Sequence, residues 1–349
     1  MVILKQEKNR QSIKKRRKKK KWKRILLVAL IILLIPLSYV GYLMYTAYDA
    51  ANGSYEELER GDKSKLREKA VQIDKEPFSV LLMGIENYAS GGKGGRSDTL
   101  MVATFDPRNE TMKLLSIPRD TRLEIAETHK IDKITHSYNG GKERTIETVE
   151  NFLEIPIDYY ATVNFKGFVN IIDYLGGVTV DVPFDFWDYK GGDWDTKFYY
   201  TEGQMTLNGE EALTYARMRK KDPRGDFGRN DRQKQIVMAM IDKMSSPSAL
   251  LKLDKVTKEI GKNVETNFKV NYLLALRENF PNFKSNKVET LTISGYDQTI
   301  NSIYYFIPDE TSLEETKQIL KDHLNPDNII QSGTATTDDE TNIDTSNNQ

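Results

Sequence analysis

Arginine side chains are concentrated in residues 216–235, which read ARMRKKDPRGDFGRNDRQKQ. Aspartates, glycines and Pro223 interrupt the five arginines and three lysines, which a plain charged helix would not need. Arg217 and Arg219 end one predicted helix, and Arg229 begins the next. A guanidinium group is a planar fork of donors that matches two phosphate oxygens, so several converging forks suit a pyrophosphate better than a duplex. The alternative is a solvated basic surface, which the internal glycines disfavour.

Two carboxylates flank a glycine-rich loop in residues 81–100, LLMGIENYASGGKGGRSDTL. Glu86 follows a continuous apolar run, and Asp98 follows the loop, with Arg96 two residues before it. The loop lacks the G-x-x-x-x-G-K-[ST] spacing of a P-loop. Two carboxylates at the end of a strand can hold Mg²⁺ when a phosphate supplies further oxygen ligands. A surface loop with incidental acidic residues is the alternative.

A third segment, SIPRDTRLEI at residues 116–125, places Arg119 and Asp120 after an apolar run and a proline. An Arg–Asp pair at the end of a strand is often structural, so this segment alone predicts no chemistry. The three segments together supply two carboxylates for a metal and four or five arginines for an anion.

The elements that must position these residues alternate between strand and helix patterns. Residues 78–85, FSVLLMGI, form a continuous apolar run, as in a strand buried on both faces. Asn208 and Glu211 have the spacing of a capping box at the start of a helix. Further strands are predicted at 99–107, 112–118 and 178–182, and a further helix at 165–175. This alternation predicts an α/β domain with helices on both faces of a sheet.

The N-terminal part of the chain predicts one membrane anchor. Residues 1–24 hold 13 of the 51 lysines and arginines, and residues 25–48 carry no charge. As a helix the uncharged run reaches roughly 36 Å, enough to cross a bilayer core of ~30 Å. A cleaved signal peptide is the alternative, but the run is too long and lacks an A-x-A-like site. The positive-inside rule places the N-terminus in the cytoplasm and the rest outside, in a single-pass protein of the cell membrane.

The predicted organisation is a basic cytoplasmic tail at 1–24, a transmembrane signal-anchor helix at 25–48 and a linker at 49–76. A catalytic domain outside the cell follows at 77–325, and a disordered tail at 326–349 ends the chain. The whole chain has a formal net charge of zero and the basic tail holds only one acidic residue, so the outer part has a net negative charge. This charge excludes general nucleic-acid binding by the outer part. The basic tail is expected to contact anionic membrane lipid. The chain has no cysteine, which excludes disulfides and thiolate chemistry. The simplest anion for arginines outside a membrane is a lipid-linked pyrophosphate.

From about Pro77 to Ile241 the chain resembles the LytR–CpsA–Psr proteins of bacterial envelopes. The resemblance runs, in the family's order, through LLMGIEN, GRSDTLMVATFDP, KLLSIPRDTRLEI, KITHSYNGG, DYLGGVTVDVP, LNGEEALTYARMR and DPRGDFGRNDRQKQ. It implies an α/β/α sandwich with a central mixed sheet and an apolar slot for a polyprenyl chain. It also implies a phosphotransferase that moves a glycopolymer, such as wall teichoic acid or capsule, from an undecaprenyl-pyrophosphate carrier to peptidoglycan.

The resemblance also assigns roles to individual residues. Glu86 and Asp98 match the carboxylates of a Mg²⁺ site, with Mn²⁺ as an alternative ion. The family usually has aspartate where this chain has Glu86, which puts the metal geometry in question. Asp98, Asp226 and Arg119 form the expected catalytic set. The expected pyrophosphate-binding residues are Arg96, Arg119, Lys133, Arg217, Arg219, Arg229 and Gln233.

Other functions fit part of the same pattern. A lipid-pyrophosphate phosphatase would use the same site with water as the acceptor. A transcriptional regulator or a non-catalytic envelope scaffold is a further alternative, although the acidic body and the predicted topology disfavour a regulator. Either Asp226 or Asp98 can accept the proton of the attacking hydroxyl, and the sequence does not choose between them. His136 is a third candidate, but a lone histidine is more often structural.

Overall fold

A computed structural model of the chain describes residues 53–86, 95–191, 193–246 and 282–325, together with residues 256, 259, 262–269, 272, 275–276 and 279–280. Among these residues, no helix has the length and apolar character needed to cross a membrane. The predicted basic tail, membrane anchor and C-terminal tail lie outside the described residues.

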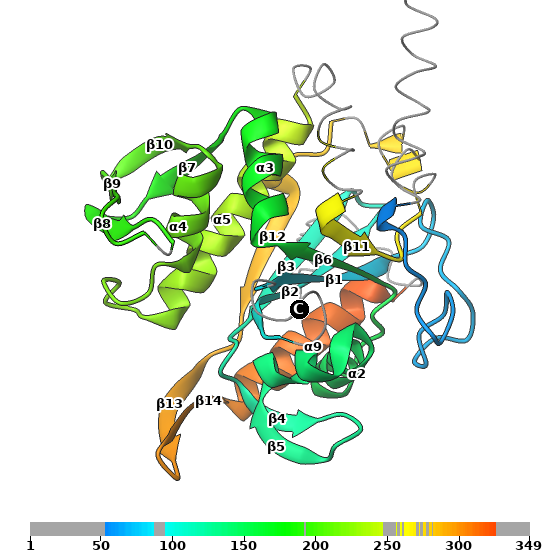
Figure 1. Ribbon diagram of the computed structural model, residues 1–349. Helices are drawn as coiled ribbons and strands as arrows, with labels where there is room; N and C mark the ends of the chain where they lie inside the picture. The colour runs from blue at the N-terminus through cyan, green and yellow to red at the C-terminus, as the bar shows by residue number, and fades with distance from the viewer. Residues whose placement is uncertain are drawn as a thin grey trace, which may run out of the picture.

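A six-stranded mixed sheet forms the centre of the molecule, in the order β11-β6-β1-β2-β3-β12 (Figure 1). Strand β1 pairs with β2, and β2 with β3, in antiparallel fashion, while β6 runs parallel to β1 and β12 parallel to β3. The strands are β1 (Phe78–Ile85), β2 (Ser97–Asp106), β3 (Thr111–Ile117), β6 (Tyr159–Asn164), β11 (Val264–Thr266) and β12 (Val288–Thr292). The predicted central mixed sheet is therefore confirmed.

Helices cover both faces of this sheet, as the predicted sandwich requires (Figure 1). Helices α2 (Gly141–Leu153) and α9 (Glu310–Leu324) pack on one face, in a core that includes Leu81 and Met83 of β1. Helices α3 (Phe165–Leu175) and α5 (Asp226–Met244) lie over the other. Because successive side chains of a strand point to opposite faces, β1 has apolar residues at both alternating sets of positions, which explains the run FSVLLMGI.

A second core lies beside the sheet and joins α3 and α5 to α4 (Gly209–Arg217) and to the antiparallel pair of β7 (Val178–Val182) and β10 (Gly203–Leu207). Strand β7 alternates buried and exposed residues as predicted. The predicted capping box is present: Asn208 accepts a hydrogen bond from the Glu211 amide, and Glu211 accepts one from the Asn208 amide. Helix α4 therefore begins at a fixed point.

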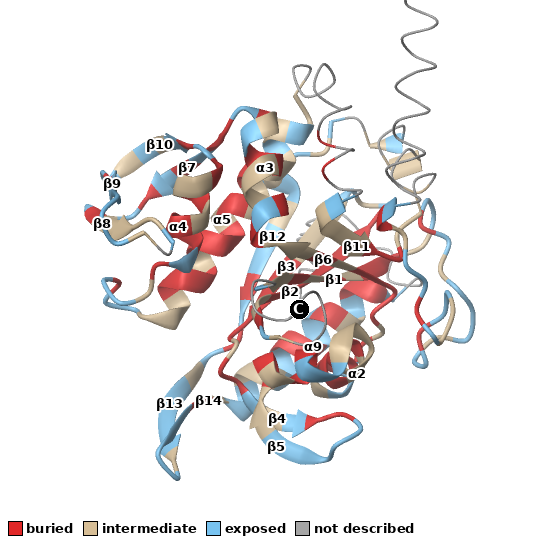
Figure 2. Ribbon diagram, in the orientation of Figure 1, coloured by how far each residue is buried: buried red, intermediate tan, exposed pale blue. Residues whose placement is uncertain are grey.

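Three further hairpins extend from this body. They are β4 (Arg122–Ile125) with β5 (Lys130–Lys133), β8 (Phe186–Tyr189) with β9 (Lys197–Tyr200), and β13 (Gly295–Ile300) with β14 (Ile303–Pro308). Two 3₁₀ segments, η1 (Ile134–Gly140) and η2 (Ser285–Lys287), complete the described elements. Strand β13 is largely exposed, and the hairpin that it forms with β14 projects from the body (Figure 2).

Residues 53–76 differ from the predicted linker, because the structure packs them against the domain. Leu58 and Ile73 are buried in two cores, at 2% and 3% exposure. Arg67 donates two hydrogen bonds, of 2.9 and 2.8 Å, to the buried carboxylate of Asp158. The segment is polar and almost without regular structure, so its composition resembles a linker although two apolar side chains and an arginine hold it in place.

Candidate active site

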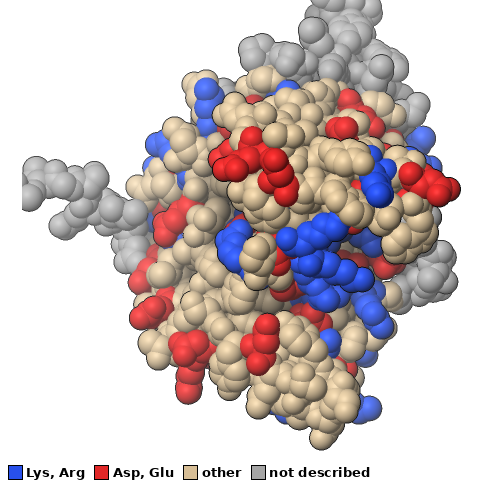
Figure 3. All heavy atoms as spheres, turned by 90° about the vertical axis from the view of Figure 1, so that its left-hand side faces the viewer, with Lys and Arg blue, Asp and Glu red and all other residues tan. Residues whose placement is uncertain are grey.

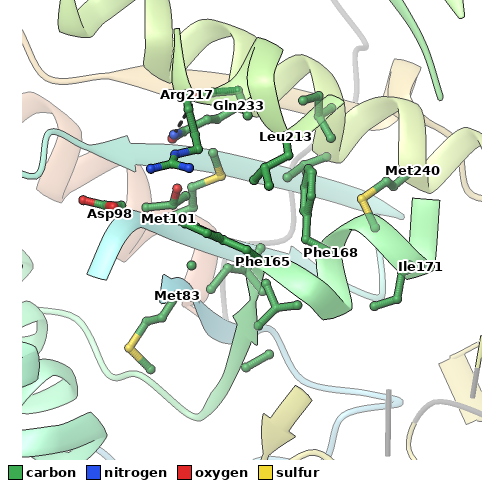
Figure 4. Close-up of a pocket in the computed structure, with 18 of the residues that line it drawn as sticks. Met83, Asp98, Met101, Phe165, Phe168, Ile171, Leu213, Arg217, Gln233 and Met240 are labelled. Carbon is green, nitrogen blue, oxygen red and sulfur yellow. Dashed lines mark hydrogen bonds between the residues drawn. The ribbon is translucent and has the colours of Figure 1, made fainter. Parts of the chain in front are cut away.

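A cavity of about 1250 Å³ lies between the sheet and the helices α3 and α5. Its walls are mostly apolar side chains from both layers, and Figure 4 shows that Phe168, Ile171 and Met240 lie toward one end. Asp98, Arg217 and Gln233 lie toward the other end. The volume exceeds the ~300–1,000 Å³ that is common for small-molecule sites. The cavity therefore suits a long apolar ligand that carries a polar group at one end.

The polar end lies where β1 and β3 end and β2 begins, so three neighbouring strands deliver residues to one edge of the sheet. The beginning of α5 and the end of α4 meet the same edge. Lysine and arginine side chains gather in a recess on the face of the molecule shown in Figure 3. The predicted site residues that line this end of the cavity are Asp98, Arg119, Arg217, Arg219, Arg229 and Gln233. The structure thus brings together six of the predicted site residues.

A bulge in β2 places Asp98. Gly84 pairs with Thr99 and Ile85 pairs with Ser97, so Asp98 is an extra residue in the ladder. Its Oδ1 accepts a 2.6 Å hydrogen bond from Nη1 of Arg119, the first residue after Pro118. Burial opposes the charge of Arg119, but the contact with Asp98 raises its pKa above the ordinary value. Arg119 is therefore a permanent cation in the wall of the cavity.

The first turn of α5 supplies a buried ion pair. Nη2 of Arg229 lies 2.8 Å from Oδ1 of Asp226 and donates a 3.0 Å hydrogen bond to Oδ2. Burial raises the pKa of the Asp226 carboxyl and lowers the pKa of the Arg229 guanidinium. The Nε atoms of Arg119 and Arg229 are buried donors that find no hydrogen-bond acceptor among the described residues. Both guanidinium groups line the cavity, so their positive charge lies beside the space in which an anion could bind.

Arg217 and Arg219 are held more loosely, each with 41% of its side chain exposed. The Arg217 guanidinium lies 4.5 Å from the ring centroid of Phe165 and 3.7 Å from a carboxylate oxygen of Glu86. Nη1 of Arg219 lies 3.8 Å from Asp120 and 3.9 Å from an oxygen of Asp226. These separations are longer than hydrogen bonds, so neither guanidinium group is hydrogen-bonded to a carboxylate.

A buried clamp fixes the segment that carries Arg217 and Arg219. Arg232 is 1% exposed, pairs with Asp222, and donates to the carbonyl oxygens of Tyr215, at 3.1 Å, and Met218. A side chain at Gly228 would place its Cβ only 1.8 Å from Asp222 Oδ2. The Arg232 side chain therefore holds the backbone and does not line the cavity, whereas Arg229 and Gln233 of the same helix do.

The remaining predicted residues lie around this centre. Gln233 is buried and donates a 3.2 Å hydrogen bond to the carbonyl oxygen of Ala216, which joins α5 to α4. Lys133 donates a 2.7 Å hydrogen bond to Asp120 Oδ1, on the side of the arginines away from the large cavity. Arg96 is exposed just before β2, and no contact among the described residues draws it to the cluster.

Other residues at the site were not predicted. Asp120 lies within 4 Å of Lys133, Arg119 and Arg219, so it balances the cluster's positive charge. Its position next to Arg119 was the only signal in the sequence. Lys220 and Lys221 also line the large cavity. His136 instead pairs with Asp132 at 2.8 Å and does not line the cavity, in keeping with a structural role.

The two predicted metal ligands, Glu86 and Asp98, lie at the same end of the β1–β2 pair. The described part of the chain holds no group of three histidine or acidic residues that could bind a metal alone. Two carboxylates provide the hard oxygen donors that Mg²⁺ prefers, and an ion held by so few protein ligands needs phosphate oxygens and water as well. The donor set therefore fits a cation that binds together with a phosphorylated substrate.

Known proteins share this fold. The chain is 53% identical over 289 residues to the polyisoprenyl-teichoic acid–peptidoglycan teichoic acid transferase TagV of Bacillus subtilis, covering 81% of this chain and 74% of that protein. The crystal structure of B. subtilis TagV superposes with a TM-score of 0.65 at 54% identity, over 72% of this chain and 98% of the other. A structure of TagT bound to LIIa-WTA gives a TM-score of 0.66 at 36% identity, over 77% and 99% of the two chains. The model of the LytR_cpsA_psr family matches residues 41–322, and the chain belongs to that family.

Proposed function

We propose that this protein is a transferase that moves an anionic glycopolymer of the teichoic acid type from a polyisoprenyl-pyrophosphate carrier to peptidoglycan. The observation that carries the proposal is an apolar cavity of about 1250 Å³ that ends in converging arginines. Its relatives are named for this activity, and one solved relative is titled as bound to LIIa-WTA. The carrier's chain would occupy the apolar walls, and its pyrophosphate would lie at the arginines.

The arginines have different tasks in this proposal. Arg229 is buried and Arg119 partly buried, and their ion pairs with Asp226 and Asp98 hold the two guanidinium groups as fixed positive charges. Arg217 and Arg219 are exposed and uncommitted, so they can close on the phosphates as the substrate binds. Gln233 fixes the end of α4 against α5, and Lys133 and Arg96 add positive charge at the edge. Positioned donors of this kind stabilise the charge that develops on phosphoryl oxygens.

The reaction is a displacement at the phosphorus that carries the polymer's first sugar. A hydroxyl oxygen of peptidoglycan forms a bond to this phosphorus, and the bond to the bridging oxygen breaks. The lipid phosphate leaves with that oxygen. Asp226 is the better proton acceptor, since burial raises its pKa, and the 3.0 Å hydrogen bond that it accepts from Arg229 is longer than the 2.6 Å hydrogen bond from Arg119 to Asp98. The hydrogen bond between Arg119 and Asp98 would keep both side chains in place at the phosphate.

Asp98, which lines the polar end of the cavity, and Glu86, the residue after β1, would hold Mg²⁺, or Mn²⁺ in its place. When bound, the ion would neutralise charge on the phosphate oxygens. Glu86 is the more exposed of the two carboxylates, with 48% of its side chain accessible against 19% for Asp98. Asp98 is thus the better-fixed ligand.

The proposed location is the outer face of the cell membrane, because the carrier and peptidoglycan meet there. The uncharged run at residues 25–48 would anchor the chain with its basic tail in the cytoplasm and its catalytic domain outside. The same run would keep the mouth of the cavity close to the lipid substrate.

The direct test uses the full-length protein in lipid vesicles with a lipid-linked teichoic acid precursor and soluble peptidoglycan oligomers. The expected product is a phosphodiester between the two glycans, detected by mass, that forms only with a divalent cation. Release of free sugar phosphate without transfer would identify a lipid-pyrophosphate phosphatase instead. Tight donor binding with no turnover would identify a non-catalytic scaffold.

A further inference from the structure

A second cavity, of about 300 Å³, lies on the other side of the arginine cluster. Arg219 lines both cavities, so it forms part of the wall between them. The second cavity is built from the segment after β3, the start of α5 and the β13–β14 hairpin. Its lining residues include the carboxylates Asp120, Asp226 and Asp297 and the aromatic rings Phe227, Tyr304 and Phe306.

The two cavities have different chemistry. Only the larger one has extended apolar walls, whereas the smaller combines aromatic faces with hydrogen-bond acceptors. A sugar ring presents C–H bonds on its faces and hydroxyl groups around its rim, so it is complementary to such a mixture. Asp297 accepts a 2.7 Å hydrogen bond from the Tyr304 hydroxyl, which holds these two groups side by side. The volume is at the lower end of the range for small-molecule sites.

The hairpin is attached to the catalytic cluster by its backbone. The amide of Phe306 donates a 2.9 Å hydrogen bond to the carbonyl oxygen of Asp120. The Phe306 ring packs edge-on against Phe227 in the first turn of α5, at 5.5 Å between centroids. Nζ of Lys133 lies 5.6 Å from the centroid of the Tyr304 ring. The aromatic wall therefore keeps a fixed relation to Asp226.

We propose that the second cavity is the acceptor site, and that it takes a sugar ring of the peptidoglycan glycan strand. This inference rests on the proposed function, and it adds where the acceptor binds and which residues select it. Tyr304 and Phe306 contact the ring, Asp297 accepts a hydrogen bond from a hydroxyl group on its rim, and the attacking hydroxyl lies at Asp226.

The direction of the reaction supports this assignment. In phosphoryl transfer the attacking and leaving oxygens lie roughly in line on opposite sides of the phosphorus. The leaving group carries the lipid, which the large cavity holds on one side of Arg219. The attacking hydroxyl must then approach from the other side, and the second cavity is the described space that opens there.

Asp226 is placed to take the proton. It lines the second cavity and not the large one, and its carboxylate is paired with Arg229 in the same turn of α5. The hydroxyl proton passes to this carboxylate as its oxygen bonds to phosphorus, and the lipid phosphate departs with the bridging oxygen into the large cavity. Asp120 lines the same cavity, where Lys133 holds it at 2.7 Å.

The test compares two variants of the second cavity with a matched control in full-length protein. Tyr304→Ala and Asp297→Asn should each raise the KM for soluble peptidoglycan oligomers about tenfold, while the dissociation constant for the lipid-linked donor changes less than about twofold. Tyr304→Phe keeps the ring and should recover most of the loss. Tyr296→Ala alters an exposed aromatic residue of the same hairpin that lines neither cavity, and should behave as wild type.

The outcomes separate this inference from the proposed function. A wild-type protein that does not transfer polymer would overturn the proposed function and the acceptor site with it. A wild-type protein that transfers, with unchanged acceptor KM in both variants, would overturn the acceptor site alone. Weakened donor binding in Tyr304→Ala would assign the cavity to the polymer of the donor and would also reject the inference.

Discussion

Arg219 allows the proposed pyrophosphate site to be tested by geometry rather than by charge. Replacing Arg219 with lysine keeps the positive charge but removes the planar fork of donors. In the structure Nη1 of Arg219 is 3.8 Å from Asp120 and 3.9 Å from Asp226, so the fork makes no hydrogen bond to either. We therefore expect the substitution to change the interaction with phosphate far more than it changes the fold.

The expected effect on folding stability is smaller than the expected effect on the transfer rate. An ion pair as exposed as these contributes about 0–1 kcal/mol to folding, so the free energy of unfolding should fall by less than about 1 kcal/mol. Loss of one positioned donor to developing charge costs about 2.7–4 kcal/mol, or roughly a hundred- to a thousandfold in rate. The catalytic effect should exceed the stability effect by at least about 2 kcal/mol.

The assay measures polymer transfer from a lipid-linked donor, with urea unfolding of the same preparations as the stability reference. Arg144→Lys is a suitable control, because Arg144 pairs with Glu127 at 2.8 Å on α2, on the opposite face of the sheet. Lys220 and Lys221 are unsuitable controls since both line the cavity. If Arg219→Lys transferred polymer at the wild-type rate, the arginine cluster would act only as diffuse charge and the proposed clamp would be wrong.

Four further predictions follow from the same geometry. Asp98→Asn should abolish Mg²⁺-dependent transfer and leave the fold nearly intact, whereas Glu86→Asp should be mild; metal titrations of transfer compare the two. Burial raises the pKa of Asp226, so the transfer rate should fall as the pH drops through this raised pKa, and Asp226→Asn should be inactive at every pH measured. Burial lowers the pKa of His323 from 6.5 to about 4. The unfolded chain then binds the proton more readily, and stability should be lost as pH falls from about 6.5 toward 4, by at most ~1.4 kcal/mol per pH unit; unfolding of His323→Gln across this window checks the slope. A reporter fused after Gln349 should be active only outside the cytoplasm.

Each of these four predictions has a result that would contradict it. Full activity of Glu86→Ala would remove Glu86 from the metal site. An acid limb of the pH profile that persists in an active Asp226→Asn variant would assign proton transfer to another group. An unchanged stability slope in His323→Gln would locate the acid sensitivity elsewhere. A cytoplasmic reporter signal would separate the domain from its proposed substrates.

The parts of the fold that the sequence predicted are those set by local physics. Strand β1 is mostly apolar because one face lies in the core and the other lines the apolar cavity, and β7 alternates because only one face is buried. The cap at Asn208 depends on residues three apart. The β4–β5 and β13–β14 hairpins were not predicted, because they are short and in part exposed, and their packing depends on residues distant in the chain.

The candidate site divides in the same way. Arginine spacing indicated an anion site, and the structure gathers Arg119, Arg217, Arg219 and Arg229 around one cavity. Arg229 and Arg232 are three residues apart on one helix, yet their side chains do different things. Arg229 lines the cavity, whereas Arg232 donates its hydrogen bonds to backbone carbonyl groups and pairs with Asp222. Only the packing of α4 against α5 separates these two roles, and a linear pattern does not contain that information. Tyr304 reaches the site from a hairpin with no chemical signature.

The two faces of the central sheet are packed to different extents, and this difference affects the stability of the fold. The face under α2 and α9 closes into a core of fully buried side chains, while the face under α3 and α5 keeps a cavity of about 1250 Å³. A lipid chain in that cavity would be a temporary part of the hydrophobic core. Binding to the folded state alone raises stability by RT ln(1 + [L]/Kd), so the melting temperature should report how much carrier lipid is loaded. The protein would be most stable to unfolding while it holds its donor and less stable after the lipid leaves.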